Sequence, residues 1–155
     1  MKIFALLALA LTMIAAPAFA ASADFEIKKV DVNLISTPEY TVNPAYKQAR
    51  SKKWIAIDVT FEAKPEFTDE LTINYYVYFA KRLFVGQVNH VSIQKGRDLH
   101  SVAYISPSAI AEILQGRQLN LSDVENVAVT ITRPGIGAPI SVKTSRPGTG
   151  AWWET

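Results

Sequence analysis

Apolar and polar residues alternate over short spans along most of the chain, a pattern that predicts β-strands. Residues 54–62 place apolar side chains on one parity and mostly polar ones on the other, so this segment has one buried face. Residues 71–79 repeat the pattern, and the stretch 64–69 between them is predicted to be a turn. The predicted inward side chains are Ile55, Ile57, Val59 and Phe61 in the first strand, and Leu71, Ile73, Tyr75, Val77 and Phe79 in the second.

Shorter alternating segments extend this pattern on both sides. In residues 24–35 the parity of the apolar positions changes between Ile27 and Val30, which indicates a β-bulge. A short corner is predicted at 81–82, and Pro134 to Gly137 is predicted to turn the last hairpin. The remaining predicted strands are 83–93, 99–105, 127–131 and 140–142.

One helix is predicted over residues 106–116. Ser106 is suited to the N-cap, Pro107 to the first helical position and Gly116 to the C-terminal stop. A helix of about ten residues is unstable alone, so it is expected to pack on the strands.

The order of these elements favours a mostly β fold. About seven antiparallel strands, with the helix in the crossover between the fifth and sixth, predict an immunoglobulin-like β-sandwich. The chain contains no cysteine, so packing alone must hold such a sandwich together. Residues 36–53 are predicted to form a long excursion with a short edge strand near 40–42.

The first residues have the features of a secretory signal peptide. The apolar run 3–16 ends near Ala18-Phe19-Ala20, which supplies small residues at the positions that signal peptidase requires. Cleavage is predicted after Ala20, with Ala23 as a nearby alternative, so residues 21–155 form the single mature domain. The other interpretation is an uncleaved anchor, but the run is shorter than the roughly 20 residues that span a bilayer.

Export places the mature protein in the periplasm or at the outer membrane and cell surface. No later segment is long and apolar enough to predict a transmembrane helix. The formal net charge is +2, and a near-neutral chain argues against a nucleic acid partner.

The chain shows no pattern typical of catalysis. It has no Gly-x-Ser-x-Gly, phosphate loop or dinucleotide fingerprint, and cysteine chemistry is excluded by composition. We therefore expect a protein that is not an enzyme and that has no cofactor.

The two histidines, His90 and His100, are candidates for a pair that binds a metal or responds to pH. If residues 93–97 form a hairpin loop, the two rings face each other across adjacent strands. They then lie on the face of the sheet that is opposite to the face of Val91 and Ile93. A pair on a flat face lacks a third ligand, so a simple exposed cross-strand pair is the preferred interpretation and no metal is expected. A loop one residue longer or shorter would place the rings on opposite faces.

Aromatic and basic residues outside the predicted core are the remaining candidates for binding. Aromatic side chains on a solvent face can stack on sugars or anchor a protein, unless the excursion 36–53 or the tail covers them. A basic cluster in the excursion is either a solvated loop or a docking patch. The aromatic candidates are Trp54, Tyr76, Tyr78, Trp152 and Trp153, and the basic cluster comprises Lys47, Arg50, Lys52 and Lys53.

From DFEIKKVDVNLIS to SRPGTGAWWET, the chain resembles a small exported family of Verrucomicrobia encoded beside type IV pilus-like assembly genes. The resemblance implies an immunoglobulin-like fold, a location in the cell envelope near the outer membrane, and a structural or adhesive role with self-association. Type IV pilins keep a long apolar N-terminal helix, whereas here the apolar segment is expected to be removed. The resemblance therefore implies a pilus-associated protein, and it transfers no catalytic residue.

Two functions follow as hypotheses. The first is a non-enzymatic envelope protein that acts in structure, assembly or adhesion through contacts with another protein or with itself. The alternative is a carbohydrate-binding module that binds a glycan through the outward aromatic residues.

Overall fold

Two long antiparallel strands organise the fold, which a computed structural model describes for residues 24–37, 51–147 and 150–154. The predicted signal peptide and the predicted edge strand near 40–42 lie outside these residues. Strands account for 66% of the described residues, so the mostly β prediction is confirmed. The strands are β1 (Phe25–Ser36), β2 (Lys53–Phe79), β3 (Arg82–Ile105), β4 (Val124–Thr132) and β5 (Ser141–Thr144).

The β2–β3 hairpin turns at Ala80 and Lys81, which both have positive φ angles of 46° and 63°. Two left-handed residues are what the primed two-residue hairpin turns require, because their twist matches that of the strands. The turn therefore lies one residue before the corner predicted at 81–82.

Both long strands bend without breaking. The register of β2 against β3 shifts between Phe61 and Ala63 and again between Ala63 and Phe67. Gly96 lies opposite Ala63 at the bend, where a Cβ would come within 2.9 Å of Leu99 Cδ2. The first half of β2 pairs with β1 and the end of β3, whereas the second half pairs with β4 and the start of β3.

This continuity corrects two predicted turns and the strand count. Residues 64–69 and 93–97 lie inside β2 and β3, so five strands carry the apolar segments that predicted about seven. Bulges absorb the extra residues at the bend, which lets each strand change layer while keeping its partner. Turn-forming residues such as Pro65 are tolerated at such irregular positions.

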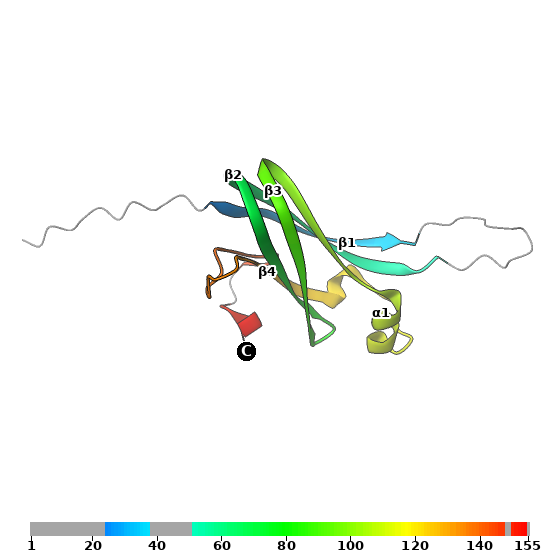
Figure 1. Cartoon of the computed structure of the whole chain (residues 1–155). Helices are drawn as coiled ribbons and strands as arrows, with labels where there is room; N and C mark the ends of the chain where they lie inside the picture. The colour runs from blue at the N-terminus through cyan, green and yellow to red at the C-terminus, as the bar shows by residue number, and fades with distance from the viewer. Residues whose placement is uncertain (1–23, 38–50, 148–149, 155) are drawn as a thin grey trace, which may run out of the picture.

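The result is one curled, half-barrel sheet whose halves face each other. Its order is β1-β2-β4-β5, with β3 paired to β2. Figure 1 shows β3 alongside β2. β1 and β5, the first and last strands of this order, are also linked, because the Ile27 backbone N–H donates a hydrogen bond of 3.1 Å to Ser141 Oγ. The bulge predicted after Ile27 is confirmed, because the β1–β2 register shifts between Ile27 and Lys29.

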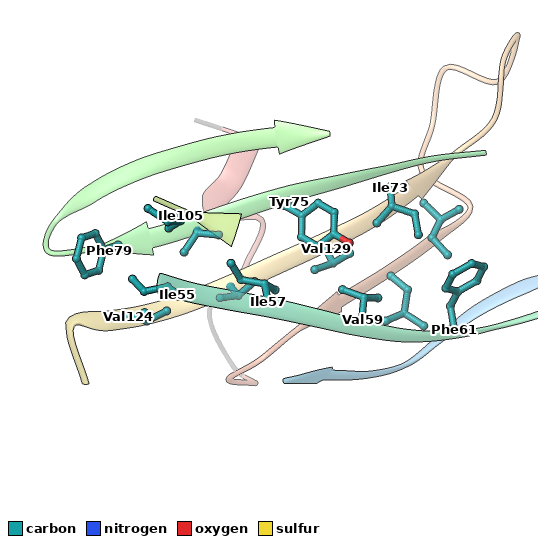
Figure 2. Packing of buried hydrophobic residues seen from close by; sticks show 14 of the residues in the cluster. Ile55, Ile57, Val59, Phe61, Ile73, Tyr75, Phe79, Ile105, Val124 and Val129 are labelled. Carbon is teal, nitrogen blue, oxygen red and sulfur yellow. The ribbon is translucent and has the colours of Figure 1, made fainter. Parts of the chain in front are cut away.

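The core fills the space between the two halves of the sheet. Figure 2 shows Ile57 and Val59 from the first half of β2 facing Tyr75 and Ile73 from its second half. Every side chain predicted to point inward in these two segments is buried, with at most 3% of its surface exposed. Contributions from the other strands include Phe25, Ile93, Ile105, Val127, Val129 and Ile131.

The one α-helix among the described residues, α1 (Pro107–Leu114), confirms the predicted helix, and two 3₁₀ turns follow it: η1 (Leu121–Asp123) and η2 (Trp152–Glu154). Ser106 Oγ accepts a hydrogen bond of 3.3 Å from the Ala109 N–H, as expected of an N-cap. Ile110 and Leu114 are buried against the sheet. Within the described ranges, no helix is both long and apolar enough to cross a membrane.

Candidate functional site

The aromatic candidates do not form one surface, because they lie on different halves of the sheet. Trp54, in the first half of β2, packs edge-on against Tyr104 with ring centroids 6.3 Å apart. Its indole N–H donates a hydrogen bond of 2.9 Å to Thr37 Oγ1. Tyr104, which the sequence analysis did not single out, is 56% exposed.

The second aromatic group joins the chain's tail to the other half of β2. The Trp152 ring lies 6.1 Å from that of Tyr78, and Trp153 packs edge-on against Trp152 at 5.7 Å. All three side chains are half-buried. Tyr76, two residues before Tyr78 in β2, is also half-buried. Its cross-strand neighbours are Val85 in β3 and Ala128 in β4.

A hollow of about 780 Å³ lies beside Tyr78 and Trp152. Glu125 accepts a hydrogen bond of 3.0 Å from the Lys81 N–H, and Arg146 donates one of 3.4 Å to the Val124 carbonyl. An aromatic wall combined with carboxylate, amide and guanidinium groups suits a polar ligand with an apolar face. The other residues that line the hollow are Leu83, Asn126 and Pro147.

The histidines are not opposite each other, which corrects the predicted pair. Because β3 continues through 93–97 without a turn, His90 and His100 lie in the two halves of one strand. His90 Nε2 lies 2.7 Å from Ser101 Oγ, while His100 Nδ1 lies 2.9 Å from Asp58 Oδ1. The described residues contain no group of three or more side chains that could hold a metal ion.

His90 belongs to a short polar chain that enters the core. The Tyr75 hydroxyl donates a hydrogen bond of 2.6 Å to Ser101 Oγ, and both residues are almost fully buried. Burial raises the pKa of Tyr75 to about 12, although the bond to Ser101 opposes this shift. Burial also lowers the pKa of His90. Since Ser101 is 2% exposed, the chain connects the two halves of the sheet and does not present a nucleophile to solvent.

The lowered pKa of His90 predicts a stability that depends on pH. Its folded-state pKa lies below the unfolded value of about 6.5, so the folded protein binds the proton less readily. This contribution to stability is present above the unfolded pKa and is lost as the pH falls through the folded pKa. Urea denaturation between pH 7.5 and 5.5 should therefore show a decreasing free energy of unfolding.

Two variants isolate the residue responsible. His90→Gln should flatten this pH dependence because it removes the titrating group, whereas His100→Gln, on the exposed side of the same strand, should retain it. An unchanged slope in His90→Gln would show that another group causes the dependence.

The basic cluster is only partly described. Lys47 and Arg50 lie outside the described residues, whereas Lys52 and Lys53 are exposed beside the end of β1. The Lys52 carbonyl accepts a hydrogen bond of 2.8 Å from the Thr37 N–H, and Lys53 Nζ donates one of 2.8 Å to Ser36 Oγ. These contacts extend the β1–β2 pairing.

The outer edge of β3 is the feature most suited to binding. In the part of the chain that the structure describes, β3 pairs only with β2, so the other side of its backbone is open. Residues 83–94 contain no Asp, Glu, Lys or Arg. Val85 and Val91 are 67% and 70% exposed, and Leu83 is 39% exposed. We call residues 83–94 the β3 edge.

The other strands at the sheet margins differ from the β3 edge. β1 carries exposed charges that form ion pairs, including Lys29 with Asp31 at 2.7 Å. β5 has only four residues, and its Ser141 contacts β1. Charged side chains and short length are the usual means by which edge strands avoid unwanted pairing, and the β3 edge has neither.

These features define a mostly β protein with an antiparallel curled sheet, an open strand edge and no arrangement typical of a catalytic centre among its described residues. A family model matches residues 16–155, and the chain belongs to that family. No curated protein sequence matches the chain.

The fold also occurs in a solved structure. The chain is similar to a crystal structure of a protein from Akkermansia muciniphila, with a TM-score of 0.69 and 19% sequence identity. The similarity covers 84% of this chain and 74% of the other. At 19% identity the match shows a shared fold alone. Akkermansia belongs to the Verrucomicrobia, the phylum of the family that the sequence resembles.

Proposed function

We propose that this is an exported, non-enzymatic protein of the cell envelope, associated with a pilus-like assembly, that acts through protein–protein contacts. The observation that carries this proposal is the β3 edge, which is long, uncharged and unpaired on its outer side. A strand with these properties is a template for pairing with another strand.

Strand pairing supplies both affinity and specificity. Backbone N–H and C=O groups of the β3 edge would hydrogen-bond to an added strand, while alternate side chains choose the partner. Val85 and Val91 are exposed in positions to make such side-chain contacts.

The location and the pilus association rest on the sequence. The apolar leader supports export, and the resemblance to the verrucomicrobial family supports an envelope role. We also propose that the fold is related to the immunoglobulin-like fold. The face-to-face packing of the sheet's two halves around one core supports this relationship.

Site-specific photo-cross-linking tests the proposal. A photoreactive amino acid at position 85 should yield cross-linked products in intact cells that produce the protein. The same amino acid at position 29, on the charged β1 edge, should yield few. Mass spectrometry of the products from position 85 should identify an envelope protein or a second copy. Equal or absent cross-linking at both positions would refute an interaction at the β3 edge.

The hollow beside Tyr78 and Trp152 favours carbohydrate binding as a second candidate function. Its aromatic wall and polar groups match the two faces of a sugar ring. A glycan array should then detect binding that Tyr78→Ala abolishes and Trp54→Ala, in the other aromatic group, leaves unchanged. An array without binding would exclude this candidate.

A further inference from the structure

We infer that the β3 edge pairs with the β3 edge of a second copy of this chain, antiparallel and about a two-fold axis through Val88. This inference rests on the proposed function and names the partner of the same edge. The resulting dimer would join the two curled sheets side by side through their β3 strands.

The absence of charge favours a second copy as the partner. Pairing the β3 edge with itself places no Asp, Glu, Lys or Arg opposite a like charge within residues 83–94. A strand rich in charge would find no opposite charge along this edge and would lose solvation. The formal net charge of +2 also leaves little long-range repulsion between copies.

The spacing of the exposed side chains fixes the register. Val85 and Val91 lie equally far from Val88, so a two-fold axis there places Val85 of each copy opposite the partner's Val91. The same register places Gln87 opposite the partner's Asn89, which pairs amide with amide. An isologous interface requires this kind of self-complementarity.

Cross-strand neighbours point to the same face of a sheet, so each valine pair would lie on the outer face. Val85 and Val91 are among the most exposed apolar side chains of the described residues, at 67% and 70%. Burial of these side chains against each other would remove apolar surface from water and stabilise the dimer.

An apolar groove beside the edge provides a second reason for a partner. It has a volume of about 270 Å³ and opens between Phe84–Gly86 in the first half of β3 and Ala103–Ile105 in the second. The core residues Ile57, Tyr75 and Val77 line it. A strand added alongside Phe84–Gly86 would lie at the mouth of this groove, where Val85 and Tyr104 are the exposed apolar lining residues.

Compensating charges test both the dimer and its register. Val85→Lys and Val91→Glu should each raise the dimer dissociation constant by at least about tenfold, because each places a charge opposite an apolar partner. The double variant Val85→Lys/Val91→Glu should restore dimerisation, since each lysine then faces the partner's glutamate. Within one copy these positions are six residues apart on the same strand, which is too far for them to pair.

Size-exclusion chromatography with light scattering, over a range of concentrations, gives the measurement for the purified exported protein. Val142→Lys, at an exposed position of β5, is the matched control and should leave the dimer unchanged. Circular dichroism and thermal denaturation establish that each variant is folded.

A wild-type protein that stays monomeric at all concentrations would overturn this inference. A dimer that Val85→Lys leaves intact, or that the double variant does not restore, would overturn the β3 pairing or its register. Cross-linking from position 85 distinguishes the two proposals. Products with another envelope protein from a monomeric chain would support the proposed function alone, whereas no products would refute both.

Discussion

Phe61→Ala should lower the free energy of unfolding by about 3–5 kcal/mol. Phe61 is 1% exposed and lies at the first register shift of β2, where the strand passes from one layer to the other. Its ring also packs edge-on against His90, with centroids 5.9 Å apart. Truncation removes buried apolar surface and leaves a cavity at the bend, where the continuous backbone limits collapse.

Urea denaturation followed by tryptophan fluorescence measures this loss. Phe67→Ala is the matched control, because Phe67 lies in the same strand beyond the bend and is 55% exposed. Its expected change is within about 0.5 kcal/mol. Similar losses of unfolding free energy for the two variants would contradict the placement of the Phe61 side chain in the core at the bend.

Ser101→Ala should lower the free energy of unfolding by about 1–3 kcal/mol. The substitution removes the acceptor for the Tyr75 hydroxyl, which stays buried in an apolar core, and it removes the contact of His90. An unsatisfied buried hydroxyl incurs its full desolvation cost.

A double-mutant cycle separates this cost from the loss of packing. Tyr75→Phe removes the hydroxyl that Ser101→Ala would leave without a partner, so the two losses should not add. The expected coupling between the substitutions is about 0.5–3 kcal/mol. Ser122→Ala, at an exposed position in η1, should have little effect. Additive losses would show that the Tyr75–Ser101 bond contributes little.

The candidate site was only partly accessible from sequence. The signal for the β3 edge is present as an uncharged run, yet the apolar alternation of residues 83–93 places Val91 on the same face as Ile93, opposite the histidines. Val91 is 70% exposed and Ile93 only 8%, although the two share a parity. Ser92, with a φ of 55°, lies between them and reverses the face.

The position of Ser101 is a second signal in the sequence. It shares the inward parity of Leu99 and Ala103, and a polar residue in such a position requires a buried partner. Its partners lie elsewhere along the chain, at Tyr75 and His90. Only the bend in β3 brings His90 near Ser101.

The sequence by itself determined the strand character, the inward faces of residues 55–61 and 71–79, the bulge after Ile27 and the helix that begins at Pro107. Each of these depends on side-chain periodicity or on contacts between residues close in the chain. The tertiary structure alone decided whether residues 64–69 and 93–97 would turn or bend, and hence which edge stayed open. That choice depends on pairing between distant strands, because a bulge next to a partner strand keeps hydrogen bonds that a turn would lose.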